Sequence, residues 1–297
     1  MAAIITRRQR LLDALIGVLL EDRTAVELRE ETTEFPPVIK LKMPLWLQGM
    51  TASTGTLVRL SEGAGFHTRD CFGIARTVIE TAINICYTIA VGDEVARRAE
   101  RHARQKTYRD FYRDSVIGDS RILVQYLGRP EVEDVQGLKE EIAEFSGPKP
   151  GREKNWIDLS LDDRIREAGK TFGPKVLTHL HAAQQNVYRH SSEILHGTFF
   201  GAIYFLGTSG PNPPSSPEKM LEKWAMDHFL LLQSTDVALS AVIMAFHAKY
   251  GFEFVSQANA KLTKEIGLVP FFRDGPKSKS EEGSSPFRCT IVVPKGE

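Results

Sequence analysis

The segment from residue 66 to residue 92 most constrains the fold, because its apolar residues recur with the spacing of one α-helical face. Seven of them share one arc of a helical wheel: Ile74, Val78, Ile79, Ala82, Ile85, Cys86 and Ile89. An amphipathic helix of this length is stable only when that arc packs against other elements. We therefore expect a largely buried helix over residues 66–92.

Helical spacing continues along most of the chain, interrupted by proline and glycine. We expect further helices over residues 5–30, 45–64, 93–128, 131–145, 160–170, 174–198, 217–249 and 255–267. Pro36 and Pro37 stop the first of these, and a short extended piece is expected over residues 38–41. Within the 93–128 helix, Leu123, Val124 and Leu127 are expected to face inward. The fold class predicted is an all-α helical bundle.

Composition shifts divide the chain into three regions. We expect an N-terminal helix and extended linker over residues 1–45, a helical bundle domain over 46–270 and a disordered tail over 271–297, where Lys, Ser, Glu and Gly dominate. The segment Phe287–Val293 could form a strand, but a lone strand needs a partner. The Pro/Gly stretch at residues 146–151 is read as a connection between two hairpins of one bundle rather than a domain boundary.

Charge and cysteine usage exclude some classes of protein. The 38 basic residues balance 38 acidic ones, so bulk charge does not indicate a strongly basic nucleic-acid binder. Three scattered cysteines predict neither a disulfide framework nor a zinc site, and we expect no metal and no cofactor. The apolar segments 71–92 and 229–246 contain Arg76, Glu80 and Asp236, which favours buried helices over membrane spans. A cytoplasmic protein without a membrane segment is expected.

Arg76 and Glu80 form an i,i+4 pair at the border of the apolar arc of the 66–92 helix. An arginine fixed by a carboxylate can hold a phosphate or a partner acid. It can equally be a structural ion pair that positions helices, and the residue pattern favours this second interpretation.

A second polar cluster lies in the stretch from Tyr188 to Gly197. Arg189 and His196 are seven positions apart, which places them about 20° apart on one helical face and roughly 10 Å apart along the axis. With Tyr188, Ser192 and Gln185 they form a continuous polar face. His196 could move the 2′-hydroxyl proton of RNA or protonate the leaving oxygen, and Arg189 could stabilise phosphate charge. The alternative is a solvated face, or one that pairs with the Arg76 and Glu80 stripe. Composition alone favours that alternative.

Other basic and imidazole groups give weaker signals. The run Arg97, Arg98, Arg101, Arg104 and Lys106 is interleaved with acidic residues, which favours a solvated face over a nucleic-acid surface. His179 and His181 would point to opposite sides of a helix, so a shared metal ion is not expected.

The order of these motifs resembles a known family. Arg76 and Glu80 are followed by Trp156, Ser160 and Arg164, and then by Tyr188, Ser191, Ser192 and His196-Gly197. This order resembles a family of uncharacterised bacterial helical proteins, a domain of unknown function, over roughly residues 50–250. The pattern also looks like the HEPN superfamily of helical bundles.

The HEPN resemblance implies a function and a site. Many HEPN proteins are dimeric, metal-independent ribonucleases of toxin–antitoxin and phage-defence systems, whose motif is an Arg, four to six residues and a His. When this motif is applied to the present sequence, the resemblance implies catalytic roles for Arg189, His190 and His196. It also implies RNA, a second copy of the chain, and an antitoxin or other protein as partners. The bundle would be HEPN-like, with extra N-terminal helices.

Two hypotheses about function follow. In the first, the chain is a HEPN-like ribonuclease whose site forms between two copies of the 174–198 helix. In the second, it is a non-catalytic binding or regulatory bundle. There, Arg76 and Glu80 join Tyr188, Ser192 and His196 in one internal polar network. A buried His196 bonded near Glu80 would favour the second. Arg189 and His196 opening into a shared cleft would favour the first.

Overall fold

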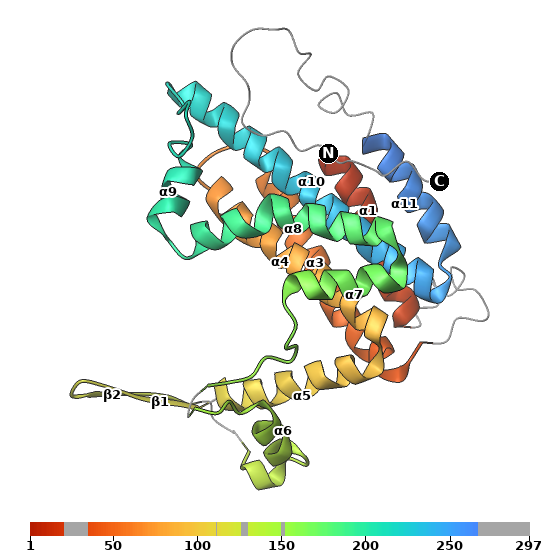
Figure 1. The fold of residues 1–297 in the computed structure, drawn as a ribbon, viewed down its shortest axis with the longest axis vertical. Helices are drawn as coiled ribbons and strands as arrows, with labels where there is room; N and C mark the ends of the chain where they lie inside the picture. The colour runs from red at the N-terminus through yellow and green to blue at the C-terminus, as the bar shows by residue number, and fades with distance from the viewer. Residues whose placement is uncertain (21–34, 111, 126–129, 150–151, 267–297) are drawn as a thin grey trace.

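The computed structural model describes residues 1–20, 35–110, 112–125, 130–149 and 152–266. Within these ranges it contains ten α-helices, one short 3₁₀ turn and one two-stranded hairpin, which confirms the all-α fold. Figure 1 shows most helices gathered in one bundle. A smaller arm, made of α5 (Asp93–Asp110), the hairpin and α6 (Leu138–Phe145), extends from one end of it.

Helix α4 (Thr68–Val91) is the central element of the bundle and confirms the strongest sequence prediction. It packs against α3 (Pro37–Leu60), α8 (Pro174–Leu195) and α10 (Pro217–Tyr250). Six of the seven residues of its predicted apolar arc are fully buried, and Ile74 is partly buried. The arc is covered on several sides because three long helices converge on it.

Helices α4 and α10 are each long and apolar enough to cross a bilayer by length and composition, and most of each apolar window is buried inside the bundle. They pack directly against one another. Their apolar surfaces therefore form the protein's own core in this structure.

A buried ion pair connects the N-terminal helix to α10 (Pro217–Tyr250). Arg8 on α1 (Ala2–Leu19) donates hydrogen bonds from Nε and Nη2 to Asp236 on α10, at 2.8 and 3.1 Å. Its Nη1 donates to Asn259 on α11 (Glu253–Ile266), and the Asn259 amide donates to Ser240 at 3.1 Å. The first predicted helix, over residues 5–30, is confirmed as far as Leu19. Its last part, residues 21–30, lies outside the described residues.

The prediction of one long helix over residues 93–128 was wrong. Helix α5 ends at Asp110, and strands β1 (Tyr112–Ile117) and β2 (Ser120–Gln125) follow as an antiparallel hairpin. Gly118, at φ +59°, provides the left-handed turn between two runs rich in β-branched residues. Leu123 and Val124 do not face inward: they are 49% and 46% exposed. Leu127 lies outside the described residues.

Two other boundaries also differ from expectation. The extended piece over residues 38–41 is instead the first turn of α3, which begins with Pro37 and continues through Pro44. Proline is favoured at the first helical position, and the burial of Ile39, Met43 and Leu47 offsets the cost of Pro44. The predicted 131–145 helix is reduced to α6, preceded by a 3₁₀ turn at Val132–Asp134.

The C-terminal half follows the sequence prediction closely. Helix α7 (Leu161–Phe172) begins at Ser160, whose hydroxyl accepts a hydrogen bond from the Asp163 amide. Helix α8 is followed by the short α9 (Phe199–Phe205), which the sequence analysis did not predict, then by a proline-containing loop and α10. The predicted disordered tail over 271–297 and the candidate strand at 287–293 lie outside the described residues.

Candidate functional site

The polar face predicted on α8 is divided between two environments. Tyr188 is partly buried and turned toward α4, whereas Arg189 and His196 are exposed. Ser192 is partly buried, and its hydroxyl makes no hydrogen bond with the rest of the described chain. The packing of α8 against α4 therefore separates residues that one face of a helical wheel had grouped.

Arg76, Glu80 and Tyr188 form a polar network between α4 and α8. Arg76 Nη2 donates a hydrogen bond to the Tyr188 hydroxyl at 3.0 Å and lies 3.3 Å from Glu80 Oε1. The guanidinium carbon is 4.4 Å from the centroid of the Tyr188 ring, within cation–π range. The network predicted between the two helices thus exists, but it contains neither Ser192 nor His196.

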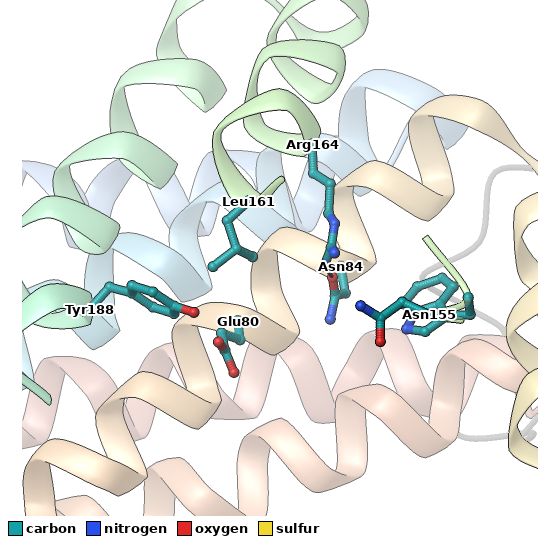
Figure 2. A pocket seen from close by; sticks show the side chains of 7 residues that line it. Glu80, Asn84, Asn155, Leu161, Arg164 and Tyr188 are labelled. Atoms are coloured by element: carbon teal, nitrogen blue, oxygen red, sulfur yellow. Dashed lines mark hydrogen bonds between the residues drawn. The ribbon is translucent and has the colours of Figure 1, made fainter. Parts of the chain in front are cut away.

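The network forms one wall of a cavity of about 250 Å³ between α4, α7, α8 and the loop before α7. Figure 2 shows Glu80 and the Tyr188 hydroxyl on one side, with Asn84, Asn155 and the Arg164 guanidinium on the other. Leu161 and Trp156 complete the lining. The Trp156 ring centroid lies 5.5 Å from that of Trp46 on α3, which fixes the loop against the bundle.

Arg164 is held at the opposite wall by backbone and amide oxygens. Its Nη1 donates to Asn84 Oδ1 at 2.8 Å, and its Nε and Nη2 donate to the Leu159 carbonyl at 3.1 and 2.9 Å. Burial lowers the pKa of this guanidinium from its ordinary high value. These three bonds use three of the five N–H groups of the side chain, so donor capacity remains toward the cavity.

Burial also affects the tyrosine of the network. It raises the pKa of Tyr188, and the nearby Glu80 carboxylate raises it further, partly offset by Arg76. Tyr188 is therefore a neutral hydroxyl at neutral pH, able to donate as well as accept a hydrogen bond. The cavity combines one carboxylate, one guanidinium, two amides and two aromatic rings.

Arg189 and His196 lie on the outside of the bundle. Helix α8 ends at Leu195, and His196 is its C-cap with helical dihedral angles, φ −76° and ψ −1°. Gly197, at φ +64°, then turns the chain toward α9. Neither the Arg189 nor the His196 side chain makes a hydrogen bond or ion pair within the described residues, and neither lines the cavity.

Two further groups lie around the end of α8. Arg69 Nη2 donates to the Ile194 carbonyl at 3.3 Å, which places a guanidinium at the C-terminal end of α8. His190 is stacked on Tyr204 of α9, with ring centroids 4.3 Å apart and planes 4° apart. Burial lowers the pKa of His190, as do the charges of Arg189 and Lys223.

The sequence analysis did not single out Asn84, Asn155 or Leu161. Asn84 was predictable, because it continues the i,i+4 spacing of Arg76 and Glu80 along α4. Asn155 has no such periodic signal, since it lies in a loop whose course depends on tertiary packing. Trp156 and Arg164 had appeared only in the resemblance.

The basic run on α5 and the cysteines, which gave weaker signals in the sequence, have structural surroundings of their own. The basic run on α5 pairs with carboxylates of α6 and the following loop, for example Arg104 with Glu141 and Arg101 with Glu144. It thereby holds the arm together. Cys71 and Cys86 are buried free thiols. No group of three or more His, Cys, Asp and Glu side chains in the described ranges is arranged to hold a metal ion.

Comparisons with known proteins relate this site to one family. A search of curated proteins and a search of solved structures each found no match. A model with the description "Family of unknown function (DUF5677)" matches residues 44–213, more than half of the 297-residue chain. The matched region contains Arg76, Glu80, Arg164, Tyr188 and His196, so it includes both the cavity and the exposed pair. It excludes α1, α10 and α11. The chain therefore belongs to this family of unknown function, DUF5677.

Proposed function

We propose that this protein is a HEPN-like, metal-independent ribonuclease that acts as a dimer, in a toxin or phage-defence role. The observation that carries the proposal is the exposed and uncommitted pair formed by Arg189 and His196. Most arginines of the described chain are paired with carboxylates or carbonyls, but the guanidinium of Arg189 is not. A permanent cation on the same helix as an imidazole, a group that can take up and give back a proton, suits phosphodiester chemistry.

An apolar surface beside this pair supports association of two copies. Leu195 is 49% exposed, and Phe199 and Phe200 at the start of α9 are 82% and 45% exposed. Exposed aromatic and aliphatic side chains that lie together commonly mark protein interfaces. Association through this end of α8 would bring two Arg189/His196 pairs to one groove.

The chemistry needs one proton acceptor and one proton donor. In the dimer, His196 of one copy takes the 2′-hydroxyl proton as the 2′-oxygen attacks phosphorus. His196 of the partner subunit gives a proton to the 5′-oxygen as its bond to phosphorus breaks. Both Arg189 side chains stabilise the charge that develops on the non-bridging oxygens. The products are a 2′,3′-cyclic phosphate and a 5′-hydroxyl.

Cleavage of labelled single-stranded RNA in EDTA tests this proposal. We expect cleavage by the wild-type protein and a loss of about 100-fold or more in Arg189→Ala and in His196→Ala. Arg166→Ala is the matched control, because Arg166 is an exposed arginine on α7 outside both sites. No cleavage by the wild type, or undiminished cleavage by both variants, would overturn the proposal.

A second candidate is a non-catalytic binding or regulatory bundle. The observation that favours it is the Arg76–Glu80–Tyr188 network, which joins α4 and α8 inside one copy. In this function Tyr188 contributes to the bundle and the cavity, while Arg189 and His196 are surface residues. An RNA-inactive protein that is dimeric in solution would favour this candidate over the first.

A further inference from the structure

The cavity between α4, α7 and α8 has the residues of a binding site and is separate from the exposed pair used above. Its volume of about 250 Å³ lies just below the range of about 300–1,000 Å³ typical of drug-sized ligand sites. It therefore suits a ligand no larger than a small metabolite or a single nucleotide unit. Its lining contains polar groups on both sides, together with the rings of Tyr188 and Trp156.

The charges of the lining exclude a simple anion site. Glu80 places a carboxylate on the wall, and its partner Arg76 is already bonded to it and to Tyr188. A free phosphate in the cavity would meet this carboxylate at close range, which costs energy in a partly desolvated site. The single carboxylate and the single guanidinium of Arg164 instead favour a neutral molecule with both donors and acceptors.

The order of polar groups along α4 indicates which class of neutral ligand the cavity can bind. Glu80 and Asn84 are one helical turn apart, with Cβ atoms about 5–6 Å apart on the same face. Glu80 offers two acceptor oxygens, and the lone pairs left by Arg76 can accept further hydrogen bonds. The Asn84 amide nitrogen makes no bond to other described residues, and Arg164 beside it keeps two N–H groups free of its three bonds. Along α4 the cavity lining thus presents hydrogen-bond acceptors at Glu80, followed one turn later by donors at Asn84 and at Arg164 beside it.

Guanine is the nucleobase whose edge complements this order. Its N1–H and N2–H₂ groups are adjacent donors that match a carboxylate, and its O6 and N7 are the acceptors that follow. The other bases lack two adjacent donors on neighbouring atoms. We propose that this cavity binds a guanine base, with Glu80 at N1–H and N2–H₂, Asn84 and Arg164 at O6 and N7, and Trp156 along the ring.

This inference does not depend on the ribonuclease activity, because Arg189 and His196 line no part of the cavity. The base can belong to a free nucleoside or to an RNA strand, since both present the same edge. The exposed Asn155 lies at the rim.

Calorimetric titration of the purified full chain with guanosine tests the assignment. We expect saturable binding of guanosine, at least tenfold weaker binding of adenosine, cytidine and uridine, and at least tenfold weaker guanosine binding by Glu80→Gln. Glu62→Gln is the matched control, since Glu62 is exposed at the end of α3 and outside the cavity. Arg189→Ala should bind guanosine like the wild type even if it abolishes RNA cleavage.

Glu80 is also part of the Arg76–Glu80–Tyr188 network, so Glu80→Gln can alter the packing of the bundle as well as the cavity. A second variant outside the network is therefore measured beside it. Asn155→Ala removes an exposed rim amide, and we expect it to fold and to weaken guanosine binding measurably. Competition with 2′-O-methyl pentanucleotides, one with a central guanosine and one of uridine only, distinguishes the source of the base. Displacement by the first alone indicates RNA; displacement by neither indicates free nucleoside. No guanosine binding, or equal binding of all four nucleosides, would overturn the proposal.

Discussion

Replacement of Arg8 by methionine tests whether one buried ion pair between α1 and α10 stabilises the bundle. Arg8 is fully buried, Asp236 is 1% exposed, and two hydrogen bonds connect them. The substitution keeps most of the apolar volume but leaves the Asp236 carboxylate without its cation. Breaking a buried pair in this way costs about 3–5 kcal/mol. We expect Arg8→Met to lower the free energy of unfolding by that amount at pH 7.

The pH dependence of the same variant gives an independent check. Burial raises the pKa of Asp236, and Arg8 partly offsets that rise. Without Arg8 the carboxyl group holds its proton to a higher pH in the folded state than in the unfolded state. A group with a raised folded pKa stabilises the protein less as the pH rises through that pKa. The deficit of Arg8→Met should therefore shrink between pH 7 and pH 5.

Urea unfolding followed by circular dichroism measures these changes. Arg7→Met is the matched control: its salt bridge to Glu265 is exposed to solvent, and exposed pairs of this kind contribute little to stability. The double variant Arg8→Met with Asp236→Leu should recover most of the loss, because no buried charge is left unpaired. An Arg8→Met protein within about 1 kcal/mol of wild type would refute the reasoning.

Three further predictions concern local features. In the folded protein the pKa of His190 lies below its ordinary value near 6.5. The neutral imidazole therefore stabilises the folded state above about pH 6.5, and this contribution is lost as the pH falls through the folded pKa. His190→Phe keeps the ring stack and should lose less stability than wild type between pH 7 and pH 5; equal losses by urea unfolding would contradict this. A Cβ at Gly201 would lie 2.4 Å from the Glu193 carbonyl oxygen, so Gly201→Ala should cost about 1–3 kcal/mol, whereas Gly210→Ala, with open space, should not. Replacing the exposed hairpin 112–125 with a Gly-Ser linker should leave the Tm within about 3 °C by calorimetry, and a larger fall would show that the hairpin supports the bundle.

The helical elements of the core were predictable because periodicity of 3.6 residues is a local property. The arc of α4, the start of α7 at Ser160 and the lengths of α8 and α10 all follow from apolar spacing, capping residues and proline or glycine breaks. Local pattern failed at the hairpin. There, charged residues of helical type run into β-branched ones, and Gly118 turns the chain back.

The candidate sites depended on information that no local pattern contains. The wheel grouped Tyr188, Arg189 and His196 on α8, but the packing of α4 against one side of that helix buries Tyr188 and leaves the other two exposed. Arg164 meets Asn84 across eighty positions of sequence. Sequence thus determined which residues carry chemistry and on which helices they lie. The packing of helices, which sets burial and long-range neighbours, determined that they form an internal cavity and an external pair.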